Sequence, residues 1–379
     1  MPQMNFLIKP ASGLCNLKCD YCFYADEICA RKQTSCSIMS DDVMEQVIKK
    51  ALAQASGTCT FLFQGGEPSL AGLAFYEKWI DAEKKYNINH VQTAHSLQTN
   101  GYLIDEKWCR FFADNQFLIG LSVDGIKATH DAFRKDSQGS GTYLKVLSAA
   151  EKLRSAGADF NVLTVVTKKT AARIRRIYES YRHQGFMWQQ YIACLDPLQT
   201  QPGSMDYSLT PELYGQFLTD LFQLWSIDLK NGCQPYIRQF ENYIGILLGF
   251  EPESCDQRGI CSFQNVVEAD GSVYPCDFYA LDEYKLGNLV TDDFAVIQER
   301  QKQSGFLSRF KSPSSTCRAC RYFFLCRGGC CRHREQPGTA YGRNYFCKSY
   351  QMFFDACLPE MERIAFSIKS NKIHVKNII

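Results

Sequence analysis

The chain alternates short apolar runs with longer segments in which apolar residues recur every three or four positions. Short runs rich in Val, Ile, Leu and Phe are typical of buried strands, and the longer amphipathic segments are typical of helices. Regular alternation of the two predicts βα units around a parallel sheet. The predicted strands are residues 5–9, 59–64, 95–99, 117–123, 160–166 and 189–193.

The amphipathic segments between these strands predict connecting helices. Ser40 is expected to cap the helix at 41–55, with Asp41 and Asp42 in its first turn. The other predicted helices are 72–86, 142–155, 171–182, 211–230 and 235–250. Six strands favour a partial, open (β/α)6 barrel over a closed barrel of eight strands, so the expected fold class is α/β.

Charge and composition narrow the class of partner. The 379 residues carry 42 basic and 40 acidic side chains, a net charge of +2, so no nucleic-acid partner is expected. The first residues carry neither a basic segment nor a long apolar one, and the interpretation is a cytoplasmic, monomeric protein with no membrane contact. Cysteine is the outlier, because 19 thiols in a reducing compartment indicate metal ligands rather than disulfides.

Three cysteines lie close together just after the first predicted strand. Cys15, Cys19 and Cys22 have the spacing C-x3-C-x2-C, with Tyr21 directly before the last cysteine. Three thiolates at this spacing can hold a four-iron cluster and leave its fourth iron open to a ligand that is not protein. The alternative is a structural zinc site, which usually takes a fourth Cys or His nearby.

Short polar side chains follow several of the predicted strands. Gln64-Gly65-Gly66-Glu67-Pro68 follows the second strand, where the glycines allow close backbone approach to a ligand and Glu67 can accept from an ammonium group. Ser122 lies at the end of the fourth strand. Arg134 is a candidate clamp for a carboxylate, although a single arginine is more often a solvated surface residue. In parallel sheets these strand ends gather at one mouth.

A second group of cysteines occupies the carboxyl-terminal third. Its members are Cys255, Cys261, Cys276, Cys317, Cys320, Cys326, Cys330, Cys331 and Cys347. Between Cys261 and Cys276, Asp270-Gly271 flanked by apolar residues predicts a hairpin, which is expected to bring these two cysteines together. The alternative interpretation of the whole group is two zinc sites.

These motifs carry a family resemblance. The three-cysteine loop followed by the GGEP stretch resembles the radical S-adenosylmethionine (SAM) enzymes, and the second cysteine group resembles the SPASM domain behind some of their barrels. The resemblance implies SAM and three [4Fe-4S] clusters as cofactors. The first cluster would be held by Cys15, Cys19 and Cys22, the second by Cys255, Cys261, Cys276 and Cys330, and the third by Cys317, Cys320, Cys326 and Cys347.

The remaining details of the site also come from this resemblance. The implied SAM contacts are Tyr21, Tyr24, Gly65, Gly66, Glu67, Ser122, Arg134 and Leu195. Either Cys330 or its neighbour Cys331 can serve the second cluster on spacing alone. The other cysteines are expected to be small buried hydrophobes or idle thiols: Cys29, Cys36, Cys59, Cys109, Cys194, Cys233, Cys331 and Cys357.

Residues 97–101, 191–198 and 274–279 narrow the resemblance to the anaerobic sulfatase-maturating enzymes. It implies oxidation of a cysteine or serine in an unfolded or nascent sulfatase, within Cys/Ser-x-Pro-x-Arg, to Cα-formylglycine without oxygen. A deoxyadenosyl radical would take a β-hydrogen, Asp277 would take the proton, and the auxiliary clusters would take the electron. The alternative for Asp277 is a hydrogen-bonded turn residue. Flavodoxin or ferredoxin is the expected class of electron donor.

The expected domains are a barrel at 1–233, a helical bridge at 234–254, the SPASM domain at 255–348 and a helix with its tail at 349–379.

One rival function is a SPASM enzyme that forms thioether or carbon–carbon crosslinks in a ribosomal peptide. Only four residues precede the first predicted strand, which is expected to leave no room for a precursor-binding module. A second rival is an electron carrier without enzymatic activity, against which the open three-cysteine loop and the GGEP stretch argue.

Overall fold

The computed structural model describes residues 4–32, 37–308, 314–335 and 342–370. They form two compact units that interleave along the chain. The first unit comprises Met1–Ser122, Arg134–Phe160 and Ser262–Leu307, and the second comprises Val123–Phe133, Asn161–Cys261 and Ser308–Ile379. The domain boundaries expected from the sequence stay a prediction.

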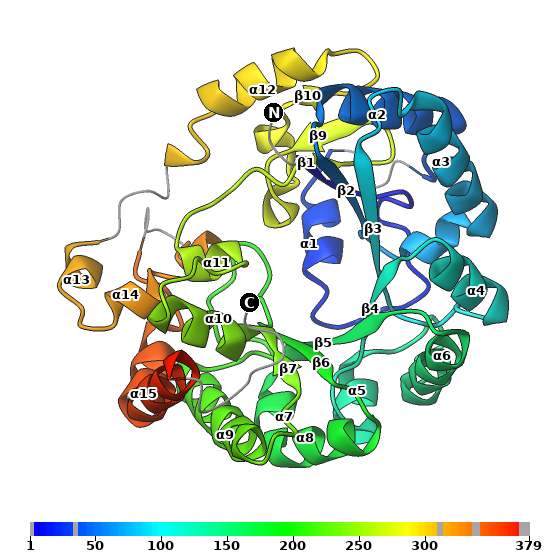
Figure 1. Cartoon of the computed structure of the whole chain (residues 1–379). Coiled ribbons are helices and arrows are strands. Elements are labelled where there is room, and N and C mark those ends of the chain that lie inside the picture. The colour runs from blue at the N-terminus through cyan, green and yellow to red at the C-terminus, as the bar shows by residue number, and fades with distance from the viewer. Residues whose placement is uncertain (1–3, 33–36, 309–313, 336–341, 371–379) are drawn as a thin grey trace. The chain divides into compact units, whose positions relative to one another are not determined.

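The first unit is built on a mixed sheet with the strand order β10-β9-β8-β1-β2-β3-β4 (Figure 1). Strands β8, β1, β2, β3 and β4 are parallel to one another, whereas β9 and β10 are antiparallel to their neighbours. The bounds are β1 Met4–Ile8, β2 Thr58–Phe63, β3 Gln92–Thr99, β4 Leu118–Ser122, β8 Val266–Val267, β9 Ser272–Tyr274 and β10 Gly287–Asn288. The predicted strands in this unit are confirmed to within a few residues.

Alternation along β2 explains why this sheet has two unlike faces. Cys59, Phe61 and Phe63 are fully buried, while the residues between them are only half-buried. The ring of Trp79 meets Phe61 and Phe63 edge-on, at centroid distances of 5.2 and 4.9 Å. Packed aromatic rings bury large apolar areas, so this face is the core and the other face is available to the site.

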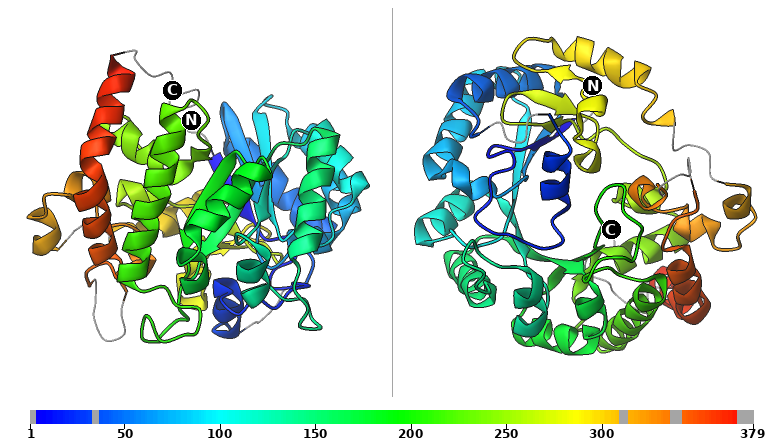
Figure 2. Two further views of the ribbon diagram at one scale, coloured as in Figure 1. Left: turned by 90° about the horizontal axis from the view of Figure 1, so that it is seen from below. Right: turned by 180° about the vertical axis from the view of Figure 1, so that it is seen from behind.

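Helices α2, α3, α4 and α6 cover one face of strands β1 to β4, and α1 lies on the other face (Figures 1 and 2). Ser40 caps α2 as predicted, since its hydroxyl accepts from the backbone N–H of Val43. The helices and 3₁₀ turns of this unit are α1 Phe23–Cys29, α2 Asp41–Gln54, η1 Pro68–Ala71, α3 Leu73–Tyr86, α4 Glu106–Asp114, α6 Tyr143–Ala156, η2 Asp277–Tyr279, η3 Asp282–Tyr284 and α12 Phe294–Gln303.

The predicted hairpin is present as β8 and β9, with Val266 opposite Tyr274. Gly271 turns the chain with a φ of +84°, a backbone conformation that glycine adopts at little cost. Because β8 also pairs with β1, the hairpin lies beside the strand that leads into the three-cysteine loop. The turn of the hairpin therefore lies level with the carboxyl end of β1, and Cys276 and Asp277 follow β9 after it has run back antiparallel to β8.

In the second unit β5, β6 and β7 are parallel neighbours. The predicted helix at 171–182 is divided, because the backbone leaves the helical region at Arg173, and the one at 235–250 begins later because residues 236–237 pair with β6. The bounds are α5 Lys127–Phe133, β5 Phe160–Val166, α7 Lys168–Ala171, α8 Ile174–His183, β6 Trp188–Ala193, α9 Pro211–Lys230, β7 Tyr236–Ile237, α10 Arg238–Leu247, α11 Cys255–Arg258, α13 Ser315–Arg318, α14 Phe323–Cys326, η5 Cys331–His333 and α15 Cys347–Lys369.

The long helix α15 packs along α9 (Figure 1). Phe353 and Phe354 are fully buried, and their rings contact Phe222 of α9 and Tyr243 of α10, with centroid distances of 5.9 and 5.2 Å. The apolar stripe of this helix is thus part of the core.

Candidate active site

The three-cysteine loop lies between β1 and α1 in the first unit. Cys22 is the N-terminal cap residue of α1, and the backbone N–H of Cys22 donates to the carbonyl of Cys19 at 3.1 Å. Burial is the main cause of a raised pKa of about 11 for the Cys15 thiol, to which the negative charges of the nearby Glu67 and Cys22 also contribute. One short loop therefore carries all three cysteines, with Cys22 close enough to Cys15 for its charge to act on that thiol.

The two glycines of the GGEP stretch pack directly on this loop. The backbone N–H of Gly66 donates to the carbonyl of Ser12 at 2.8 Å, and that of Glu67 donates to Leu14 at 2.8 Å. A β-carbon on Gly66 would lie 2.1 Å from the carbonyl oxygen of Leu14. Only glycine fits such a close approach of two backbones, so the second strand end and the cysteine loop form one assembly.

Glu67 is buried and fully engaged with protein groups. Its carboxylate accepts from the hydroxyl of Thr99 at 2.7 Å, from the backbone N–H of Asn100 at 2.8 Å and from that of Ser69 at 3.1 Å. Burial raises the pKa of Glu67, and these hydrogen bonds lower it. Glu67 thus braces the ends of β2 and β3 against each other.

Asn100, which follows β3, extends this brace to the cysteine loop. Its side-chain amide donates to Asn16 Oδ1 at 2.8 Å and lies 4.0 Å from Cys15 Sγ.

Arg134 is buried beside the cysteine loop, which excludes the interpretation as a solvated surface residue. Its Nη1 lies 4.0 Å from Cys19 Sγ, and its guanidinium stands 5.5 Å from the ring centroid of Tyr21. Ser122 ends β4 and accepts a hydrogen bond from Gln98 at 3.1 Å. The structure therefore gathers Tyr21, Arg134 and three strand ends around the cysteine loop.

Asp277 is the first residue after Cys276 and is held at both carboxylate oxygens. Lys9 Nζ lies 2.7 Å from Oδ1, and Gln64 Nε2 donates to Oδ2 at 2.7 Å. Its backbone N–H donates to Gln264 Oε1 at 2.9 Å. The carboxylate thus lies where the ends of β1 and β2 meet the hairpin.

Tyr24 is buried in the same unit, and its hydroxyl donates to Glu268. Glu268 also accepts from Ser12 Oγ at 2.8 Å and forms a 2.7 Å ion pair with Arg31. Glu268 lies in the turn of the β8–β9 hairpin, so this network ties the hairpin to the cysteine loop and α1.

The second unit brings the other cysteines together in two groups. Burial raises the pKa of Cys326 to about 12, a value to which the nearby Cys347, Cys317 and Cys320 contribute. Burial likewise raises the pKa of Cys330, with contributions from Cys255 and Cys261. Cys276 belongs to the first unit, so its joining the second group stays a prediction.

Cys331 is buried, and its Sγ lies 3.3 Å from Cys261 Sγ. Both Cys330 and Cys331 therefore stand next to Cys261. Of the cysteines expected to be idle, Cys59, Cys109, Cys194 and Cys357 are also buried, Cys29 and Cys233 are exposed, and Cys36 lies outside the described residues.

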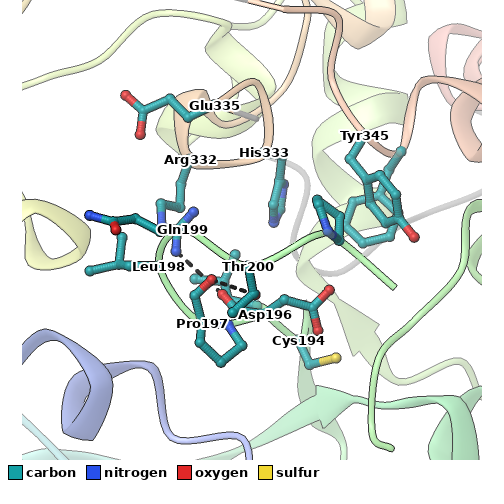
Figure 3. Close-up of a pocket in the computed structure, with 13 residues that line it drawn as sticks. Cys194, Asp196, Pro197, Leu198, Gln199, Thr200, Arg332, His333, Glu335 and Tyr345 are labelled. Atoms are coloured by element: carbon teal, nitrogen blue, oxygen red, sulfur yellow. Dashed lines mark hydrogen bonds between the residues drawn. The ribbon is translucent and has the colours of Figure 1, made fainter. Parts of the chain in front are cut away.

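The second unit also contains a cavity of about 430 Å³ beside Leu195 (Figure 3). The loop after β6 forms one wall, where Thr200 Oγ1 donates to the carbonyl of Pro197 at 2.8 Å. Arg332 closes another side and donates to the carbonyl of Asp196 at 3.3 Å. Leu195, a SAM contact implied by the sequence, thus lines an open cavity.

Sequence reasoning missed Lys9 and Glu268. Both are charged residues directly after an apolar strand, and each is buried. A charged side chain in that position is the signal that could have found them, because an ion is buried only where it is paired.

The residues present fit the cofactors that the sequence implied. A loop of three thiols beside a buried arginine suits a cluster with one open iron, and four gathered thiols suit a fully ligated one. In the described part of the chain, no three Cys, His, Asp or Glu side chains are placed to hold a single metal ion.

Within the same described residues, no helix combines the length and apolar character needed to cross a membrane.

Comparison with known proteins supports this interpretation. The radical SAM superfamily matches residues 10–180, and an iron-sulfur cluster-binding domain, SPASM, matches residues 259–321. A cysteine-type anaerobic sulfatase-maturating enzyme of Clostridium perfringens is 43% identical over 97% of this chain and 100% of its own length. A serine-type enzyme of Klebsiella aerogenes is 32% identical over 93% of this chain and 85% of its own.

A solved structure described as native anSMEcpe with bound AdoMet and Cp18Cys peptide matches with a TM-score of 0.92 and 43% identity. The match covers 97% of this chain and 100% of that one. The expected fold, a radical SAM barrel followed by a SPASM domain, is confirmed, and with it the dependence on SAM and [4Fe-4S] clusters. The chain belongs to the family of anaerobic sulfatase-maturating enzymes.

Proposed function

We propose that this chain oxidises a cysteine, in preference to serine, of an unfolded or nascent sulfatase to Cα-formylglycine. Cysteine-type relatives share more of its sequence than serine-type ones do, which supports cysteine as the target. A folded sulfatase would bury the target residue, so the substrate is an extended segment of the form Cys-x-Pro-x-Arg.

The cofactors and the protein divide the reaction between them. When bound, SAM and the clusters supply a radical that takes one hydrogen atom from the β-carbon, together with an acceptor for the second electron. The thiol must also lose its proton, which gives a thioaldehyde. Water then replaces sulfur with oxygen, so that the products are the aldehyde and hydrogen sulfide.

Asp277 is the proposed base for the thiol proton. The observation that carries this role is its placement: a carboxylate held at both oxygens by Lys9 and Gln64, directly after Cys276. A base must lie within hydrogen-bond reach of the proton it takes and keep its orientation. Placing it next to a cluster ligand lets proton and electron leave the substrate at one place.

The proposed SAM contacts have different tasks. Gly65 and Gly66 bring backbone to the ligand, and Tyr21, Ser122, Arg134 and Leu195 surround it. Glu67 and Tyr24 already bond to protein groups, so their part is to hold the loops that face SAM. The proposed cluster ligands are Cys15, Cys19 and Cys22 for the first cluster, Cys255, Cys261, Cys276 and Cys330 for the second, and Cys317, Cys320, Cys326 and Cys347 for the third.

Two partners follow from this function. A relative's structure carries a bound Cp18Cys peptide, which supports a peptide as the substrate here. A flavodoxin or ferredoxin is the proposed electron donor, and the enzyme is proposed to act as a cytoplasmic monomer.

A competition assay tests the choice of target. Two peptides that differ only in cysteine or serine at the target position are mixed with anaerobic enzyme, SAM and reductant. The cysteine peptide is expected to be converted faster. Faster conversion of the serine peptide would contradict the proposal.

A further inference from the structure

Lys9 is a fully buried lysine whose role goes beyond the proposed function. It follows β1 directly, and its side chain is 0% exposed. Its ammonium lies 2.7 Å from Asp277 Oδ1 and 3.3 Å from the ring centroid of Tyr24. Burying an ammonium is costly unless a charge or a ring face replaces its water, and here both do.

The contacts of the Lys9 stem and backbone restrict where its ammonium can lie. A β-carbon on Gly65 would lie 3.3 and 3.4 Å from Cβ and Cγ of Lys9, so the lysine stem rests against the glycine backbone. The backbone N–H of Lys9 donates to the backbone carbonyl of Val267 at 2.8 Å. Tyr24, whose ring supports the ammonium, is itself fixed by Glu268.

The same contacts determine where the Asp277 carboxylate points. Gln64 holds Oδ2, the ammonium of Lys9 faces Oδ1, and Gln264 holds the backbone N–H. Lys9 and Gln64 come from the ends of β1 and β2, the two strands that flank the cysteine loop and the GGEP stretch. The position of the carboxylate is therefore determined by residues next to the loops that are proposed to face SAM, and not only by its own hairpin.

We propose that Lys9 is the positioning residue for Asp277, an inference that rests on the proposed function. Its ammonium fixes Oδ1 so that the carboxylate meets the substrate thiol in one orientation. Lys9 touches neither substrate nor cofactor, and acts through Asp277 alone. Without it the buried carboxylate loses its cation, and of these two side-chain contacts only the one from Gln64 to Oδ2 remains.

Lys9→Met tests this role because methionine keeps an unbranched stem and removes the charge. Formylglycine formation is expected to fall about 10- to 100-fold, the scale of a misplacement of about 1 Å. The peptide KM and the rate of SAM cleavage are expected to stay near wild type, so deoxyadenosine is released without product. A general weakening of the fold would instead lower SAM cleavage and iron content together. Lys9→Arg, which restores a cation, is expected to recover part of the coupling.

Lys78→Met is the matched control. Lys78 pairs with Asp41 at 2.5 Å in the same unit, but both side chains are more than half exposed. Loss of a surface ion pair costs little, so this variant is expected to match wild type. A wild-type ratio of formylglycine to deoxyadenosine in Lys9→Met would overturn the proposal.

A double variant covers the case in which Lys9→Met alone does not fold. Lys9→Met with Asp277→Asn removes both charges together and leaves no buried ion unpaired. If Lys9 acts through Asp277, the double variant forms no less product and cleaves SAM no more slowly than Asp277→Asn. A further loss of SAM cleavage would show that Lys9 acts elsewhere.

The inference also has a readout that does not depend on the reaction. Wild-type enzyme that makes no aldehyde on cysteine or serine peptides would contradict the proposed function alone. A crystal structure of Lys9→Met is expected to show the Asp277 carboxylate turned away from its wild-type position. A carboxylate that keeps this position would overturn the role of Lys9.

Discussion

Gln64 Nε2 lies 2.7 Å from Asp277 Oδ2, which joins the residue directly after β2 to the residue directly after Cys276. The two are more than two hundred residues apart in sequence. Their contact connects the GGEP stretch, which is proposed to face SAM, with the proposed base. Cleavage of SAM and removal of the proton are thereby assigned to neighbouring parts of one unit.

Replacing Asp277 separates these two steps. In Asp277→Asn the side chain keeps its size and loses its basicity, so formylglycine formation is expected to fall by about 10²- to 10⁴-fold. Deoxyadenosine release is expected to continue, because the SAM-facing loops are unchanged. Chromatography of both products checks this, and a variant with unimpaired aldehyde yield would remove Asp277 from the mechanism.

Gly66→Ala is expected to abolish SAM cleavage. The added methyl group would lie 2.1 Å from the carbonyl oxygen of Leu14, so the GGEP stretch must move away from the cysteine loop. Gly245→Ala in α10 is the control, because its methyl group would have only a 3.9 Å neighbour and alanine favours helix by about 1 kcal/mol. The assay is deoxyadenosine formation, and an active Gly66→Ala enzyme would contradict the packing argument.

Cys330 and Cys331 are expected to differ in their effect on iron content. Cys330→Ala should lower iron and cluster absorbance by about one cluster, since a fully ligated cluster needs four thiolates. Cys331→Ala should keep its iron and serves as the neighbouring control. The reverse result would assign the ligand to Cys331, which stands 3.3 Å from Cys261.

Glu241 predicts a pH dependence of stability. Burial raises its pKa from 4.5 to about 8, and Oε2 has no hydrogen-bond partner among the described residues. The folded chain therefore retains a proton that the unfolded chain has already lost, and stability falls as pH rises from about 4.5 to about 8. Between about pH 6.5 and pH 8 the loss is about 2 kcal/mol.

Glu241→Gln removes this titration. The variant is expected to lose less stability than wild type over the same pH interval, as measured by denaturant unfolding of the anaerobic holoenzyme. Parallel curves for the two proteins would show that Glu241 does not titrate in this range.

Local sequence patterns predicted most helices and strands, because these elements depend on interactions between residues that are close in the sequence. The short apolar run at residues 59–64 predicted β2, and the recurrence of apolar residues every three or four positions predicted α2 and α3. Ser40 was recognisable as a helix cap from its neighbours alone. The boundary at Arg173 was missed, because the break between α7 and α8 lies within a continuous helical pattern.

The contacts that arrange the site are long-range, and no local pattern shows them. Ser12 and Glu268 are separated by 256 residues, and Lys9 meets Asp277 across a similar distance in sequence. The resemblance to the SPASM domain implied the group around Cys326, and Cys317, Cys320 and Cys347 are close enough to contribute to its raised pKa. The GGEP stretch did not show that the Glu67 carboxylate already accepts hydrogen bonds from Thr99 and Asn100, because those partners come from the end of another strand.

The central claim is best tested by mass spectrometry of a sulfatase-derived peptide of about 20 residues, long enough to lie extended at about 3.3 Å per residue. The peptide carries cysteine at the target position and is incubated anaerobically with reconstituted enzyme, SAM and reductant. The expected result is loss of sulfur and two hydrogen atoms and gain of one oxygen at that residue, with deoxyadenosine released in step. Deoxyadenosine release with an unchanged peptide would contradict the account.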